Sequence, residues 1–211
     1  MRAFEEEPNM TGRQYGTLGF AGVSASVLGS IALTLLEPDL SVVKNTTSDY
    51  AVGPYGSVAS ALSVLPAVGI IAIALGLRAT LPSSKRVTAS WGLLLLAGLG
   101  FGVAALFPTD PTGATESTVG GAIHATTALI TVLCFPIAVW LLRGAFARER
   151  RWGSFARTQT WFAVLVTVAF ALQFVLYPTG AVGLIQRIFL GTVATWLLFV
   201  AARLRQVEAL E

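Results

Sequence analysis

Six uninterrupted apolar runs, each of about 20 residues, constrain this chain more than any other feature of its sequence. An α-helix needs about 20 residues to cross a hydrocarbon core of ~30 Å. The runs are continuous rather than alternating, which favours helices over the strands of a membrane barrel. Charged residues make up only 12% of the chain, about half the usual share of a globular domain. We therefore predict an all-α integral membrane protein, a bundle of six transmembrane helices. The predicted helices cover residues 17–36, 57–77, 91–107, 119–142, 158–177 and 182–202.

Arginine and lysine are distributed unevenly among the segments that join these runs. The loops after the second and fourth runs and the C-terminal tail are rich in arginine, whereas the first and third loops carry mostly acids. The positive-inside rule then predicts that both termini are cytoplasmic, at the plasma membrane, which in a bacterium is the inner membrane. The predicted organisation is a cytoplasmic N-terminal segment (residues 1–16), a transmembrane domain (residues 17–202) and a cytoplasmic tail (residues 203–211).

This orientation places polar residues from distant parts of the chain on the outer side of the membrane. They lie in the outer loops or in the outer turns of the predicted helices. Polar residues within spans usually face the bundle interior or a cavity. We therefore predict an outward-facing polar pocket that binds a ligand. Its candidate residues are Asp49, Tyr55, Thr109, Asp110, His124, Gln173, Gln186 and Arg187.

Arg187 is the most informative of these candidates, because it stands inside an apolar run. An arginine within a span costs roughly 2.5 kcal/mol or more unless it pairs with another group or reaches the headgroups. We expect it to pair with Asp49 or Asp110. Such a pair could pin the outer loops to the bundle or could bind a ligand, and the sequence leaves both roles open.

His124 is the single histidine of the chain. A catalytic zinc site normally uses three protein ligands, and His124, Asp49 and Asp110 could supply them if the loops fold back. A histidine that is hydrogen-bonded in a structural role is the alternative. The sequence contains neither a G-x-S-x-G nor an H-E-x-x-H motif. We therefore favour binding over catalysis and predict no cofactor.

Small residues recur at helix-packing spacing in the first and third apolar runs. Gly19 and Gly22 lie in the first, and Gly98 and Gly102 in the third. Small faces let helix backbones approach each other closely. These residues predict packing within the bundle, or contact with a second copy.

Four segments of the sequence together resemble a family of small prokaryotic membrane proteins, domain-of-unknown-function family number 998. The first is Ser48-Asp49-Tyr50-Ala51-x-Gly53-x-Tyr55-Gly56, and the second is Leu106-Phe107-Pro108-Thr109-Asp110-Pro111. The third is Gly121-x-x-His124, and the fourth is Gly183-x-x-Gln186-Arg187. The resemblance extends over nearly the whole chain and implies the fold and the membrane location, but no activity.

Two more distant resemblances bear on function. The arrangement is similar to the DRAM and Sfk-type membrane proteins, which implies a role in lipid organisation. It is also similar to the superfamily of alkaline ceramidases and adiponectin-type receptors, which implies metal-dependent lipid hydrolysis. That superfamily has a histidine pair and seven spans, where this chain has one histidine and six predicted spans.

Three hypotheses about function follow from these observations. The first is an accessory or lipid-organising protein whose outer pocket binds a lipid headgroup or another amphiphile. The second is a metal-dependent intramembrane lipid hydrolase, and the third is a structural subunit of a membrane complex. The expected partners are membrane lipids, and either another membrane protein or a second copy. We expect no nucleic acid, because the basic residues flank apolar runs as topology requires.

Overall fold

The computed structural model describes residues 10–111 and 113–207, and all of the secondary structure in this part of the chain is helical. Three 3-10 helices, η1 (Thr47–Val52), η2 (Arg150–Phe155) and η3 (Tyr177–Thr179), lie in the connections. The α-helices are α1 (Gly12–Leu36), α2 (Gly56–Leu62), α3 (Val64–Thr80), α4 (Lys85–Leu106), α5 (Val119–Phe146), α6 (Ala156–Val175) and α7 (Val182–Val207).

Each predicted apolar run forms a helix, and six helical segments are long and apolar enough to cross a membrane. The second segment, Gly56–Thr80, contains α2 and α3. It is interrupted at Ser63, three residues before Pro66. Proline has no N–H to donate to a helical hydrogen bond, and its ring clashes with the carbonyl group four residues before it. Pro136, in contrast, lies within the continuous helix α5.

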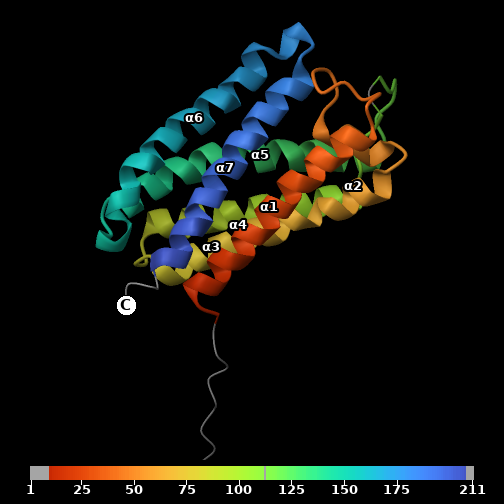
Figure 1. Cartoon of the computed structure of the whole chain (residues 1–211). Coiled ribbons are helices and arrows are strands. Elements are labelled where there is room, and N and C mark those ends of the chain that lie inside the picture. Colours follow the sequence, from red (N-terminus) through yellow and green to blue (C-terminus); the bar gives the residue numbers. More distant parts are fainter. Residues whose placement is uncertain (1–9, 112, 208–211) are drawn as a thin grey trace, which may run out of the picture.

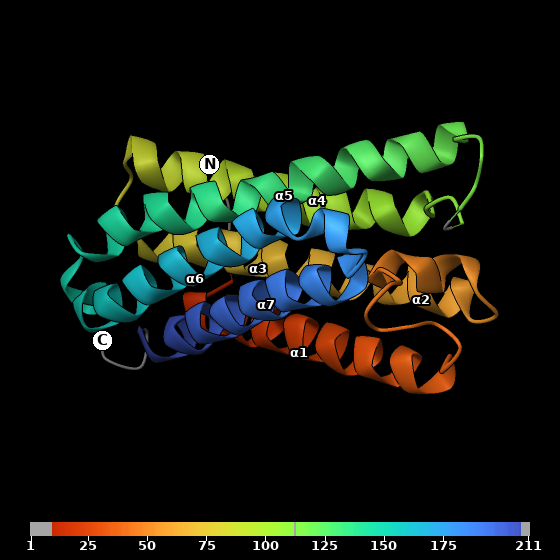
Figure 2. The ribbon, with the colours of Figure 1, turned by 90° about the horizontal axis from the view of Figure 1, so that it is seen from above.

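Successive helices pack as antiparallel neighbours, and the ring closes between the first helix and the last. α3 packs on α4, α4 on α5, α5 on α6 and α6 on α7, while α1 packs against both α3 and α7 (Figures 1 and 2). The start of α1 and the end of α7 therefore lie at the same end of the bundle (Figure 1).

Glycines determine how closely α1 approaches α3. A Cβ atom on Gly22 would lie 2.9 Å from the Cα atom of Gly69, and one on Gly19 would collide with Ile73. Gly98 of α4 is similarly close to Ile71 of α3, so the predicted packing role is confirmed at these positions. Gly102 has no atom within 4 Å of its Cβ position and takes no part in this packing.

The core contains one polar bridge besides its apolar side chains. Gln159 of α6 is fully buried; its Nε2 donates to the Val139 carbonyl oxygen at 2.8 Å, and its Oε1 accepts from Trp196 Nε1 at 2.9 Å. This side chain therefore connects α5, α6 and α7. Nearer the other end, the rings of Phe135, Phe170 and Phe189 connect the same three helices.

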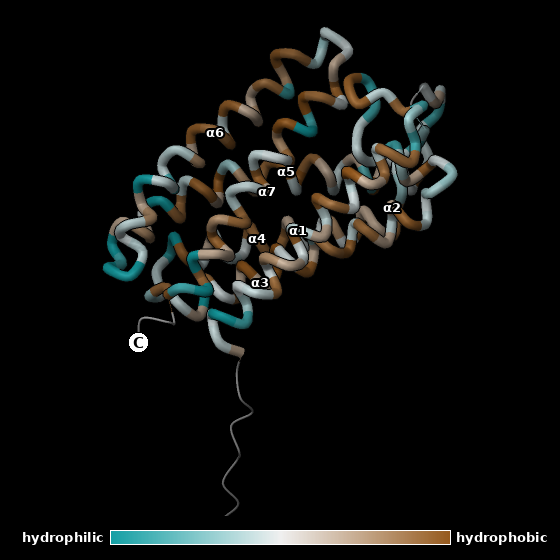
Figure 3. Tube along the Cα trace, viewed as in Figure 1, coloured by the Kyte–Doolittle hydropathy of each residue, from teal (hydrophilic) through white to brown (hydrophobic). Residues whose placement is uncertain are grey.

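The two ends of the bundle carry opposite charge. We call the end where α1, α4 and α6 begin the basic end, because every described lysine and arginine except Lys44 and Arg187 lies there, with Glu149 as its described acid. The opposite, acidic end carries Glu37, Asp39, Asp49, Asp110 and Glu116. Hydrophilic residues gather at the ends and hydrophobic residues along the helices (Figure 3).

The structure describes only part of the two predicted terminal segments. Residues 1–9 and 208–211 of those segments lie outside the described residues. The described remainder is mostly helical, because α1 already begins at Gly12 and α7 continues to Val207.

Candidate functional site at the acidic end

Residues 41–50, in the connection between α1 and α2, are fastened to the start of α7 by hydrogen bonds of Gln186 and Arg187, which we call the loop clamp. Gln186 Oε1 accepts hydrogen bonds from the Thr47 backbone N at 2.7 Å and from Thr47 Oγ1 at 3.0 Å. The backbone N of Leu184 also donates to the Val43 carbonyl oxygen at 3.1 Å. The loop backbone therefore runs against the first turn of α7.

Arg187 contributes three more hydrogen bonds to the clamp. Its Nη1 donates to the carbonyl oxygens of Val42 at 3.0 Å and Asn45 at 2.5 Å, and its Nη2 donates to Tyr50 Oη at 3.2 Å. Tyr50 Oη in turn donates to Thr34 Oγ1 of α1 at 3.2 Å. Of the two roles that the sequence left open for Arg187, these contacts provide loop pinning, with carbonyl and phenolic oxygens as hydrogen-bond acceptors.

Gly183 makes this close approach possible. A Cβ atom at this position would collide with the carbonyl oxygen of Asn45, which is one of the acceptors of Arg187. The residues of the Gly183-x-x-Gln186-Arg187 pattern thus act together. The glycine leaves room for the loop backbone, and the two side chains one turn later form hydrogen bonds with it.

Asp49 shapes the loop from within. Its side chain is only 6% exposed, and its Oδ2 accepts from the Thr46 backbone N at 2.7 Å and from Asn45 Nδ2 at 3.3 Å. Asp49 therefore holds in place the turn whose Asn45 carbonyl group meets Arg187.

A second cluster joins the end of α4 to the start of α5. Asp110 accepts from Thr118 Oγ1 at 2.6 Å, from the Thr118 backbone N at 3.0 Å and from Ser117 Oγ at 3.1 Å. The hydrogen bond from the Thr118 side chain is the main reason why the pKa of Asp110 lies below its usual value, against the opposing effect of desolvation. Gly121 leaves room for this carboxylate, with which a Cβ atom would collide.

His124 completes the second cluster. The side chain is 8% exposed, and its Nδ1 lies 2.8 Å from the carbonyl oxygen of Phe107. A carbonyl oxygen can only accept, so this contact requires the proton on Nδ1 and leaves Nε2 of the neutral ring as an acceptor. The histidine thus ties the Phe107-Pro108 corner to α5.

The structure distributes the predicted pocket residues over two clusters with different helices. The loop clamp and Asp49 connect the first loop with α1 and α7, whereas Asp110 and His124 connect α4 with α5. Among residues 10–111 and 113–207, Asp49, Asp110 and His124 do not form a group able to hold a metal ion. Tyr55 is 39% exposed and Thr109 is half-buried, and neither side chain takes part in the hydrogen bonds of the two clusters.

Two further features of this half of the molecule stand out in the structure. Glu37, which sequence reasoning did not select, is only 6% exposed, and its Oε1 has no hydrogen-bond partner within the described part of the chain. Gly53 leaves room for this carboxylate. Gln173 Nε2, on α6, is likewise buried without a partner. The sequence signal that could have indicated Glu37 is its position directly after an apolar run. Gln173 was among the predicted pocket residues because of its depth in the predicted span.

The six apolar helices and their charged ends define the fold of a multi-pass membrane protein. More specifically, the chain belongs to the DUF998 family, whose model, described as a protein of unknown function, matches residues 20–203. This confirms the family resemblance of the sequence. Neither the curated proteins nor the solved structures show a significant match to the chain.

Proposed function

We propose that the protein is an accessory membrane protein that binds an amphiphile, such as a lipid, between α5 and α6 in the acidic half of the bundle. The observation that carries this proposal is the amide nitrogen of Gln173, buried without a hydrogen-bond partner within a membrane-spanning segment. An unpaired polar group in hydrocarbon costs free energy, so a ligand oxygen that accepts from Gln173 would be stabilised there.

The position of Gln173 supports a ligand from the lipid phase. It lies four residues after Ala169, on the helix face that also buries Phe162 and Val166. The side-chain hydrogen bonds between α5 and α6 lie nearer the basic end, where Trp140 Nε1 donates to Thr167 and Arg143 Nε donates to Thr160. Towards the acidic end the two helices diverge in the view of Figure 1.

A second unpartnered group lies at a similar depth. Thr131 Oγ1 of α5 is buried and has no hydrogen-bond partner within the described residues. Continuing the register from Trp140 and Thr167 brings the part of α5 near Thr131 level with Gln173. Thr131 Oγ1 faces Gly100 of α4, so the Gln173 amide is the donor for which phosphate, carbonyl or sugar oxygens of an amphiphile headgroup would be acceptors.

The test is the lipid that the purified protein retains in detergent, measured by mass spectrometry relative to protein. Gln173→Leu is expected to lose most of the retained lipid, because it removes the amide donor and keeps a similar side-chain volume. Thr195→Val is the control, since Thr195 is exposed on α7 and bonds only to its own helix, at the Gly191 carbonyl oxygen. Equal retention by Gln173→Leu and the control would refute the proposal.

We also propose that the basic end faces the cytoplasm. The supporting observation is the charge difference between the two ends, which follows the positive-inside rule. A reporter fused to the C-terminus that is active only in the cytoplasm is expected to be active, and an extracytoplasmic C-terminus would overturn this orientation.

A further inference from the structure

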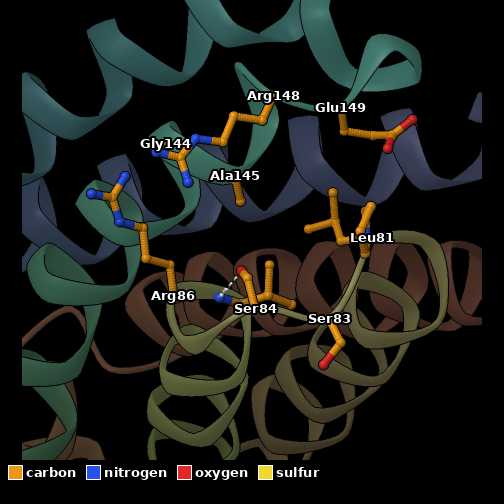
Figure 4. Close-up of a pocket in the computed structure, with 10 residues that line it drawn as sticks. Leu81, Ser83, Ser84, Arg86, Gly144, Ala145, Arg148 and Glu149 are labelled. Atoms are coloured by element: carbon orange, nitrogen blue, oxygen red, sulfur yellow. Dashed lines mark hydrogen bonds between the residues drawn. The ribbon is translucent and has the colours of Figure 1, made fainter.

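The basic end contains a cavity that lies away from both polar clusters and from Gln173. Its volume is about 100 Å³, and it lies between the α3–α4 connection and the end of α5 (Figure 4). The residues that line it include Arg86, Arg148 and Glu149, with Leu81 and Val87 as buried apolar members.

Two guanidinium groups converge at one side of this cavity. The Nη1 atom of Arg86 lies 2.6 Å from where a Cβ atom on Gly144 would be, so the group rests on the last turn of α5. Arg148 extends over the same glycine from the opposite side (Figure 4). Within the described residues, neither guanidinium takes part in a hydrogen bond or an ion pair with the rest of the chain. Two like charges that face one another without an acid between them favour an anion at that point.

The acidic residue that lines the cavity, Glu149, interacts with an arginine outside the cavity. Glu149 accepts from the backbone N of Arg151 at 3.3 Å and forms an ion pair with Arg151 Nε at 3.5 Å. Figure 4 shows it on the opposite side of the cavity from the two guanidinium groups. Glu149 therefore leaves the charges of Arg86 and Arg148 uncompensated.

The walls of the cavity are held by packing. Trp152 is fully buried and stacks on Phe146 with ring centroids 4.4 Å apart, which fixes the turn that carries Arg148 and Glu149. On the other side, Ser84 Oγ accepts from the Val87 backbone N at 3.3 Å and caps α4. The two arginines are therefore presented from rigid elements, with apolar residues beside them.

We propose that this cavity binds the phosphate group of an anionic ligand through Arg86 and Arg148. Guanidinium groups bind phosphate oxygens through paired, charge-assisted hydrogen bonds. The site lies at the membrane-flanking end of the helices, with Leu81 and Val87 next to the charges. A phospholipid headgroup and a soluble phosphate compound both carry this chemistry, and the experiment separates them.

The experiment compares two double variants that remove the same charge. The cavity variant is Arg86→Gln with Arg148→Gln. The control is Arg150→Gln with Arg157→Gln, two exposed arginines of the same end that do not line the cavity. The purified full chain is titrated with phosphatidylglycerol, with phosphatidylcholine and with inorganic phosphate, and binding is followed by native mass spectrometry and by thermal shift.

The wild-type chain is expected to bind phosphatidylglycerol more tightly than phosphatidylcholine. The cavity variant should weaken that binding by about fivefold for each arginine, while the control stays within about twofold of the wild type. A thermal shift with inorganic phosphate that is lost in the cavity variant, without any preference for phosphatidylglycerol, would support the same site and assign it to a soluble phosphate compound.

Two results would overturn the proposal. One is an equal loss of binding in both double variants, which would indicate a diffuse positive surface. The other is a wild-type chain that binds no anionic probe better than phosphatidylcholine. If the cavity variant does not fold, Gly144→Ala replaces it: its Cβ displaces the Arg86 guanidinium without changing any charge, and it must also weaken binding.

Discussion

Trp196 donates its indole Nε1–H to Gln159 Oε1 at 2.9 Å, and both side chains are completely buried. Gln159 passes the connection on to the Val139 carbonyl oxygen of α5. Gln173 lies on the same helix as Gln159, yet its buried amide nitrogen has no hydrogen-bond partner within the described residues. The amide of Gln159 is thus hydrogen-bonded through both its nitrogen and its oxygen, whereas the amide nitrogen of Gln173 is not hydrogen-bonded within the described residues.

This difference predicts that the same substitution destabilises the protein at one position and not at the other. Gln159→Leu is expected to lower the free energy of unfolding by about 1–3 kcal/mol, because it leaves the Trp196 N–H buried and unpaired. Gln173→Leu should not lower it in delipidated protein. Denaturant titration of both variants in the same detergent checks this, and comparable destabilisation of the two would contradict it.

The loop clamp predicts a specific sensitivity at Gly183. Gly183→Ala introduces a Cβ atom that collides with the Asn45 carbonyl oxygen, so the loop must move away from Arg187. We expect a loss of about 1–3 kcal/mol in stability, typical of overpacking, and faster amide hydrogen exchange in residues 41–50. Gly191→Ala is the matched control on the same helix, because nothing lies within 4 Å of its Cβ position. A loop that exchanges equally slowly in both variants would refute the role of the glycine.

Asp110 predicts a pH dependence. The pKa of this carboxyl in the folded chain is lowered from 3.8, chiefly by the hydrogen bond from Thr118. Its contribution to stability is therefore complete above the unfolded pKa and is lost as the pH falls through the lower folded pKa. Asp110→Asn should be less stable than the wild type near pH 7, and the gap should shrink as the pH falls below 3.8 and through the lower folded pKa. Thermal melts across this range measure the gap; a gap that is constant with pH would exclude ionisation of Asp110 as its source.

Glu37 predicts a gain in stability. The residue is only 6% exposed, and its Oε1 has no hydrogen-bond partner in the described part of the chain. Glu37→Gln keeps the shape and removes a charge that is costly to bury, so we expect a gain of about 1 kcal/mol. Glu116→Gln is the control at an exposed position of the same end. A lower melting temperature for Glu37→Gln would show that the charge has a partner or ligand that stabilises it.

The sequence was sufficient to predict the number of apolar helices, because the length and hydropathy of each run are local properties. It was sufficient to predict the family, because the order of the motifs is visible along the chain. The helix ends were less predictable: α4 begins at Lys85 and α5 continues to Phe146, beyond the apolar runs. Charged residues can continue a helix past the hydrocarbon region, where hydropathy no longer identifies it.

The arrangement of the polar residues was not predictable from their depth in the membrane. Arg187 and Asp110 share one end of the bundle, yet they belong to different clusters. What decides this is the path of the loop backbone, which depends on the close approaches at Gly183 and Gly121. A glycine three residues before the polar side chain, as in Gly183-x-x-Gln186 and Gly121-x-x-His124, is the signal that could have indicated a backbone hydrogen-bond partner.

The packing of α1 on α7 has a consequence for biosynthesis. A Cβ atom on Gly16 of α1 would lie 2.8 Å from the Ala201 carbonyl oxygen and 2.9 Å from Leu204 Cβ, so the first helix is fitted to the last. During translation, α1 enters the membrane long before its partner is made, and its glycine face has only α3 to cover it. The native bundle therefore closes only after α7 has been synthesised, and a chain truncated before α7 keeps that face of α1 open to lipid or to other nascent helices.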